Sequence, residues 1–182
     1  MTMHNDVERI LLSNEQIKER CSELGKQISK DYEGKNPIFI ALLKGAIPFY
    51  AELIKHIECD MEMDFIKVSS YEGVSSTGKV NIKRDVTTDV NGRHVIFVED
   101  IIDTGLTLAE VIKEFKNRNV ASCEVVTLVD KPEGRLIKEV EPKYKGFDIP
   151  NAFVIGFGLD YNEKYRNLPY VGILKRCVYE KQ

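Results

Sequence analysis

The chain has 182 residues, of which 43% are hydrophobic and 30% are charged, and its formal net charge is −3. These values are typical of one globular domain with a sizeable core, and they exclude a strongly basic surface that would favour nucleic acid. A cytoplasmic protein with no membrane partner is expected, because no apolar stretch is long enough to cross a bilayer and the four cysteines form no C-x-x-C pair.

Before residue 93 the sequence predicts two helices, two strands and a return strand. A capping box at 13–16, which reads Ser-Asn-Glu-Gln, predicts a helix to about residue 31. The apolar run from Ile38 to Leu42 predicts a strand buried on both faces, and Ile47-Pro48 opens a helix to about residue 57. Residues 62–68 predict a strand, 80–85 a return strand, and the polar, glycine-bearing stretch between them a surface loop.

A lysine–glycine loop follows the first buried strand. Lys44 supplies a positive charge, and Gly45 lets the backbone approach a ligand closely. Strand, glycine-bearing loop and helix together form the layout of an anion site. A lysine–glycine pair alone marks an ordinary turn more often than a ligand site, so the interpretation depends on support from elsewhere in the chain.

The stretch 93–107, RHVIFVEDIIDTGLT, carries the strongest functional signal. His94 to Val98 predicts a buried strand, the acidic residues after it predict a tight loop, and the spacing from Leu108 to Lys116 predicts a helix. A glycine-bearing turn at a helix start directs backbone N–H groups and the positive end of the helix dipole at an anion such as phosphate. Adjacent carboxylates accept hydrogen bonds from sugar hydroxyls or hold Mg²⁺.

These features together indicate a site for a phosphorylated ribose. The alternative is an acidic, N-capped helix after a buried strand, which a short D-x-G turn alone would favour. Three carboxylates and two threonines directly after a hydrophobic strand favour the functional interpretation.

Beyond this stretch, Cys123 to Val129 predicts another buried strand, which ends in a loop that begins Asp-Lys-Pro. An apolar segment at 153–157 precedes the polar run GLDYNE, and residues 170–174 predict a short strand that closes the sheet. Buried strands separated by helical patterns predict an α/β fold with a mostly parallel central sheet and helices on both faces. The charged loops all follow strand carboxyl ends, where open α/β sheets bind their ligands.

The run VIFVEDIIDTGLT at 95–107 resembles the phosphoribosyl pyrophosphate motif of type I phosphoribosyltransferases, and its EDIIDTG form is similar to that of the hypoxanthine-guanine enzymes. The resemblance implies a single domain over 1–182, with a core at about 35–150, a small hood from the N-terminal segment and about 151–182, and a mobile active-site loop. It implies transfer of phosphoribose from phosphoribosyl pyrophosphate to hypoxanthine or guanine in purine salvage. It also implies dependence on Mg²⁺ and assembly as a homodimer or homotetramer.

The same resemblance, which runs from Leu43 to Arg166, assigns roles to individual residues. In the family the peptide before the loop lysine can be cis, which here would be Leu43–Lys44, and the sequence leaves this isomer open. Ala46 stands where the family often has a second glycine. Asp103 would be the catalytic residue and would accept or share a purine proton. The remaining roles are ribose-phosphate binding by Glu99, Asp100, Asp103, Thr104, Gly105, Leu106 and Thr107; pyrophosphate binding by Lys44, Gly45 and Arg166; purine binding by Lys131, Phe153, Val154 and Asp160; a lid with Ser70 and Tyr71; and a metal site with Glu99, Asp100 and Asp160.

Other interpretations remain for single residues and for the whole chain. Without the resemblance, Phe153 would more often be a core aromatic, and Lys131 a solvated loop residue. A nucleotide-sensing or RNA-binding regulator would be expected to carry a basic stripe, a diphosphokinase a longer chain with an ATP half, and a dinucleotide oxidoreductase a G-x-G-x-x-G after a strand. The relative preference among hypoxanthine, guanine and xanthine stays open.

Overall fold

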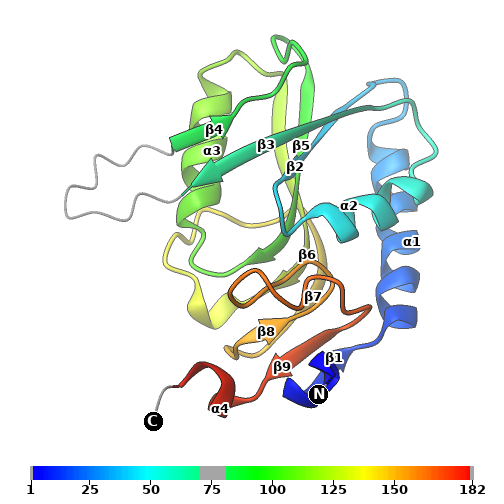
Figure 1. The fold of residues 1–182 in the computed structure, drawn as a ribbon. Coiled ribbons are helices and arrows are strands. Elements are labelled where there is room, and N and C mark those ends of the chain that lie inside the picture. Colours follow the sequence, from blue (N-terminus) through cyan, green and yellow to red (C-terminus); the bar gives the residue numbers. More distant parts are fainter. Residues whose placement is uncertain (1, 70–80, 181–182) are drawn as a thin grey trace.

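A six-stranded sheet forms the centre of the computed structural model, which describes residues 2–69 and 81–180 (Figure 1). Its strand order is β4-β3-β2-β5-β6-β7, and all neighbours are parallel except the antiparallel pair of β3 and β4. The predicted α/β fold with a mostly parallel sheet is therefore confirmed. The strands are β2 (Ile38–Leu42), β3 (Glu62–Ser69), β4 (Asn81–Arg84), β5 (His94–Ile102), β6 (Ser122–Asp130) and β7 (Tyr144–Asp148).

Helices cover both faces of this sheet, as predicted. In Figure 1, α1 (Asn14–Asp31) and α2 (Ile47–Leu53) lie on one side and α3 (Leu106–Lys116) on the other. Side chains alternate along each strand, so Phe39 and Ala41 enter the core under α1 and α2, while Ile38 and Ile40 enter the core under α3. Short helical turns complete the chain at Met3–Asp6, Ile54–His56, Pro132–Gly134 and, as α4, Arg176–Tyr179. Of the helices in the described ranges, none is long and apolar enough to cross a membrane.

The predicted start of α1 is confirmed. Gln16 N–H donates to Ser13 Oγ at 3.3 Å, and the Gln16 side chain accepts from Ser13 N–H at 2.8 Å, which completes a capping box. Four side chains along one face of α1 are buried: Ile17, Cys21, Leu24 and Ile28.

The acidic pair of the central stretch lies in a strand, and the prediction of a loop there was wrong. β5 continues to Ile102, and its last residues still pair with β6, as Ile101 does with Val129. The two isoleucines extend the apolar character past the carboxylates, so the backbone keeps its ladder hydrogen bonds. Glu99 and Asp100 are thereby held on a rigid element.

The strand predicted at 170–174 forms, but it does not close the main sheet. β9 (Val171–Leu174) lies between β1 (Val7–Leu12) and β8 (Val154–Ile155) in a separate, antiparallel three-stranded sheet. This small sheet combines segments from both ends of the chain, beside the carboxyl ends of the main strands (Figure 1). Strands β1 and β7 were not predicted from the sequence.

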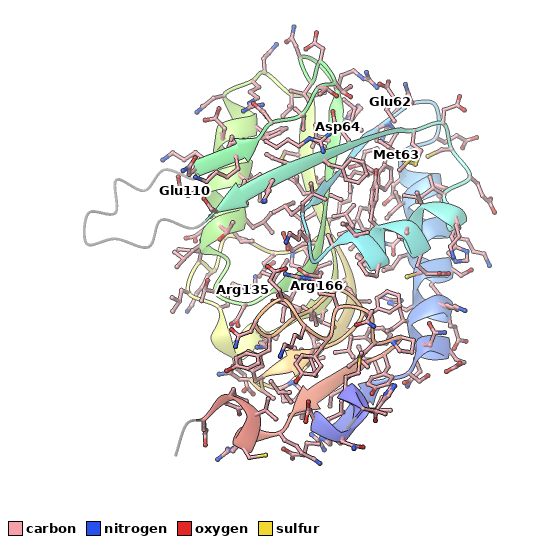
Figure 2. The ribbon with its side chains drawn as sticks, in the orientation of Figure 1. Glu62, Met63, Asp64, Glu110, Arg135 and Arg166 are labelled. Carbon is pink, nitrogen blue, oxygen red and sulfur yellow. The ribbon has the colours of Figure 1, made fainter. Side chains whose placement is uncertain are left out.

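Asp64 on β3 is a buried carboxylate, 3% exposed, that ties this strand to the segment after β4 (Figure 2). It accepts hydrogen bonds from the backbone N–H groups of Thr87 and Thr88, each at 2.8 Å, and of Phe65 at 2.7 Å. Burial alone would raise the pKa of Asp64, but the backbone hydrogen bonds outweigh burial and hold this pKa below its usual value.

Asp64→Asn is expected to lower the free energy of unfolding at neutral pH by about 1–3 kcal/mol, because an amide replaces a charged acceptor of several buried donors. Since the folded-state pKa is depressed, the contribution of Asp64 is complete above its unfolded pKa of about 3.9 and is lost as the pH falls through the folded-state value. Urea denaturation at several pH values should show a difference between the two proteins that narrows toward acid. Exposed Asp60 provides the control variant Asp60→Asn, and a difference independent of pH would contradict the prediction.

Candidate active site

The loops after β2, β5 and β6 meet at one edge of the main sheet, where the sequence analysis placed the ligand. The first of them contains a cis peptide between Leu43 and Lys44, the bond whose isomer the sequence left open. A Cβ atom at Gly45 would overlap the carboxylate of Asp100, so the loop and the end of β5 come together only because position 45 is glycine. Gly158, from the loop after β8, packs in the same way against the carbonyl of Gly45.

The adjacent carboxylates on β5 line different depressions, because successive side chains point to opposite faces of a strand. Glu99 lines an open cleft of about 220 Å³, and Asp100 lines a neighbouring pocket of about 270 Å³. Burial raises the pKa of both carboxyl groups, and the negative charge of Asp100 raises that of Glu99 further.

The first depression, called here the donor cleft, brings together most of the residues expected to bind a ribose phosphate. Gly105 caps α3 in a left-handed conformation with φ of 81°, which turns the chain from β5 into the helix. Leu106, also expected here, is half exposed at the helix start, where its N–H lies 3.4 Å from Thr104 Oγ1. The lining residues of the donor cleft include Gly45, Glu99, Asp103, Thr104, Gly105 and Thr107.

The second depression, called here the base pocket, contains all four residues expected to bind a purine. Its lining residues are Asp100, Ile101, Asp103, Lys131, Phe153, Val154, Leu159 and Asp160. Lys131 is buried, and its Nζ lies 3.3 Å from Oδ2 of Asp103. Phe153 is 38% exposed, and one face of its ring stacks on Tyr179 at 5.0 Å between centroids. Asp103 lines both depressions, so it lies where they join.

A network of charges connects Lys44 and Arg166, the two charged residues among the three expected to bind pyrophosphate. Arg166 donates to the carbonyl of Gly158 at 2.8 Å, and its Nη2 lies 2.9 Å from Oδ1 of Asp160. Glu163 lies 3.0 Å from Lys44 Nζ and 3.5 Å from Arg166 Nη2. The hydrogen bond from Lys44 and the charge of Arg166 hold the pKa of Glu163 below its usual range.

Arg135 and Glu163 also contribute to the site, and neither was predicted from the sequence. Arg135 Nε donates to the backbone carbonyl of Asp103 at 3.2 Å, while its guanidinium pairs with the buried Asp130 and bonds the carbonyl of Val140. Arg135 thereby stabilises the turn that leads from β5 into α3. Figure 2 shows Arg135 and Arg166 in the zone between the two sheets. The positions of Arg135 and Glu163 in the sequence do not indicate the contacts that these two residues make.

The remaining two expectations concern the lid and the metal site. Ser70 and Tyr71, the predicted lid pair, lie outside the described residues. Within residues 2–69 and 81–180, no three His, Cys, Asp or Glu side chains converge closely enough to hold a metal ion by themselves.

The model of the phosphoribosyl transferase domain family matches residues 9–162, and the chain therefore belongs to this family. Curated relatives with full-length similarity are named hypoxanthine-guanine phosphoribosyltransferases. The protein of Streptococcus pneumoniae strain R6 is 57% identical over 178 residues, 97% of this chain and 98% of the relative. That of Lactococcus lactis is 55% identical over 176 residues, 96% of this chain and 95% of the relative.

A solved structure agrees with this assignment. The crystal structure of a hypoxanthine phosphoribosyltransferase from Staphylococcus aureus superposes with a TM-score of 0.94 at 46% identity, and the match covers 98% of this chain and 97% of that chain. Fold and sequence thus lead to the same family.

Proposed function

We propose that the protein transfers the 5-phosphoribosyl group from phosphoribosyl pyrophosphate to hypoxanthine or guanine, which gives IMP or GMP and releases pyrophosphate. The observation that carries the proposal is the pair of depressions that join at Asp103. One offers a helix start and carboxylates for a phosphorylated sugar, and the other a lysine and an aromatic ring for a planar base. A transferase must bring the purine next to the anomeric carbon of the sugar, and two depressions that join would place the two substrates in this way.

In the donor cleft, the backbone N–H groups at the start of α3 would bind the 5′-phosphate, together with the hydroxyls of Thr104 and Thr107. Glu99 in the donor cleft and Asp100 from the neighbouring base pocket would accept hydrogen bonds from the ribose hydroxyls. The pyrophosphate group would lie at the loop of Lys44 and Gly45 and against Arg166, where opposite charge stabilises it as it leaves.

In the base pocket, Phe153 would stack on the purine and the backbone of Val154 would bind its edge. Lys131 would donate to the 6-oxo group, and Asp160 would approach the base from the opposite loop. A purine nitrogen forms the new bond to the anomeric carbon, the bond from that carbon to the pyrophosphate oxygen breaks, and the purine's N–H proton passes to Asp103. The sugar gains oxocarbenium character during the exchange, as in glycoside chemistry.

The residues present fit a magnesium ion that the substrate helps to hold. Glu99 and Asp100 are adjacent carboxyl groups whose pKa values burial raises, and a divalent cation would offset the cost of their charges. Mg²⁺ commonly binds one or two carboxylates together with substrate oxygens, so a cluster of three side chains is not required. Glu99 and Asp100 would contribute ligands to one ion and Asp160 to a second, with substrate oxygens as further ligands, and the ions would supply neutralising charge to the pyrophosphate.

Turnover is expected to stop when excess EDTA is added with both substrates present, and to return when Mg²⁺ is restored above the chelator. Mn²⁺ should substitute in part, because it accepts similar oxygen ligands. Release of pyrophosphate measures the reaction. Full activity in EDTA would contradict the metal assignment but would leave the transferase reaction in place.

The base specificity tests the function most directly. With phosphoribosyl pyrophosphate as donor, hypoxanthine and guanine are expected to be used far better than adenine, because the donors of Lys131 would meet the 6-amino donors of adenine. A buried donor left unpaired costs about 1–3 kcal/mol, which corresponds to roughly a 5- to 150-fold preference. Initial rates with hypoxanthine, guanine, xanthine and adenine measure it. Equal use of adenine would show that Lys131 does not face the base, and no turnover of any base would favour a regulator.

The domain extent, the hood, the lid and the assembly are proposed on the same basis. Residues 1–182 would act as one domain, in which the small sheet of β1, β9 and β8 forms a hood over the base pocket. The loop with Ser70 and Tyr71 would act as the lid. A cytoplasmic homodimer or homotetramer is expected from the family, and light scattering of the purified protein measures its assembly.

A further inference from the structure

One exposed carboxylate, Glu163, bridges the two cations to which the proposed function assigns pyrophosphate. Its Oε2 lies 3.0 Å from Lys44 Nζ, and its Oε1 lies 3.5 Å from Arg166 Nη2. Lys44 belongs to the loop after β2, whereas Glu163 and Arg166 belong to the loop between β8 and β9. The carboxylate therefore links the pyrophosphate loop to the proposed hood.

The backbone presents Glu163 at this place through a conformation that side-chain-bearing residues seldom adopt. Asn162 and Glu163 have positive φ angles of 51° and 61°, and the N–H of Glu163 donates to Asp160 Oδ2 at 2.9 Å. The Glu163 side chain is 65% exposed, so it is not held there by packing. Uncommon backbone conformations are concentrated at functional sites, which favours a role for the presented carboxylate.

A carboxylate between a lysine and an arginine reproduces part of the chemistry of a pyrophosphate group. Both offer oxygens that share negative charge, and both accept charge-assisted hydrogen bonds from ammonium and guanidinium groups. Two anions at the same two cations would repel each other across a few ångströms. Pyrophosphate and the Glu163 carboxylate therefore exclude one another from Lys44 and Arg166.

We infer that Glu163 occupies the pyrophosphate subsite of the free protein and is displaced when pyrophosphate or the donor binds. The inference rests on the proposed function, because it uses the role of Lys44 and Arg166 in that function. Displacement lowers the affinity for pyrophosphate, and the return of Glu163 to its two partners assists the release of this product. The carboxylate thus acts as an internal competitor.

Titration calorimetry with inorganic pyrophosphate and Mg²⁺ tests the inference on the wild type and on Glu163→Gln, which keeps the size of the side chain but removes its charge. The variant is expected to bind pyrophosphate about two- to tenfold more tightly, since two weak, exposed ion pairs no longer compete. The gain should shrink at high salt, which screens exposed charges. Glu23→Gln is the matched control, because Glu23 forms an exposed pair with Arg20 on α1, and its Kd should equal that of the wild type.

A pyrophosphate Kd for Glu163→Gln that equals or exceeds the wild-type value overturns the inference. Glu163→Asp keeps the charge on a shorter side chain and is expected to give a Kd between those of the wild type and Glu163→Gln. Purine turnover by the wild type separates the two failures. A wild type that turns over purine and binds pyrophosphate, with no gain in Glu163→Gln, keeps the proposed function and loses the displacement, whereas a wild type without turnover or pyrophosphate binding loses both.

Discussion

Asp103→Asn is expected to lower kcat by about 10²–10⁴ while the Kd of phosphoribosyl pyrophosphate stays nearly unchanged. Asparagine keeps the size of the side chain but cannot take up the proton that the purine loses, and a general base contributes a factor of this order. Asp103 lies where the donor cleft and the base pocket join, 3.3 Å from Lys131 Nζ. Single-turnover kinetics and equilibrium binding of the donor measure the two quantities.

The control for this variant is Glu133→Gln, which changes an exposed carboxylate in the loop just after Lys131. It is expected to leave kcat and thermal stability unchanged. Thermal melts of Asp103→Asn should show that the fold persists, because the changed side chain is 47% exposed. Near-native kcat in Asp103→Asn would show that Asp103 only orients Lys131 and the turn, and that water or another group takes the proton.

Gly45→Ala is expected to lower kcat/KM for the donor by about 10² or more. The added Cβ would overlap the carboxylate of Asp100, which is 8% exposed and whose Oδ1 accepts a hydrogen bond from the N–H of Ile101 at 2.9 Å. The loop and the end of β5 must then separate, and a displacement of about 1 Å at a reacting centre can cost a factor of this size. Steady-state kinetics with varied donor measure the loss, and a crystal structure of the variant would show the shifted loop.

Gly92→Ala is the matched control for this change. Gly92 has a φ of 68°, so alanine there is strained, but a Cβ atom would meet nothing within 4 Å. It should therefore lose about 1–2 kcal/mol of stability and no activity. If Gly45→Ala lost no more activity than Gly92→Ala, the contact between Gly45 and Asp100 would not matter for the reaction.

Buried parallel strands were predictable because their signal is local. Ile38–Leu42 is a continuous apolar run, and the structure has a strand with those bounds. β1 and β7 were not predictable in this way, since their sequences VERILL and YKGFD contain charges and β1 is largely exposed. The extension of β5 through Glu99 and Asp100 depends on pairing with β6, which no local pattern reports.

The candidate site likewise has a part that is local in the sequence, which was predictable, and a part that depends on distant contacts, which was not. Residues from Glu99 to Thr107 lie in one run, so their proximity follows from the chain itself, and the family resemblance extends the prediction to Lys131 and Phe153. The contact of Glu163 with Lys44 spans 119 positions, and that of Arg135 with the Asp103 backbone spans 32. Such contacts arise from the tertiary fold, and single charged residues carry no periodic signal that would predict them.

The pairing of β1 with β9 joins Val7 to Leu174 and therefore imposes an order on folding during synthesis. On the ribosome the main sheet can form before β1 is paired, because its partner strand β9 is synthesised about 160 residues later. At about 5–20 residues per second, this wait is roughly 8–30 s. During this interval β1 has no partner strand and the base pocket is incomplete, so the residues of the donor cleft are synthesised before those that complete the base pocket.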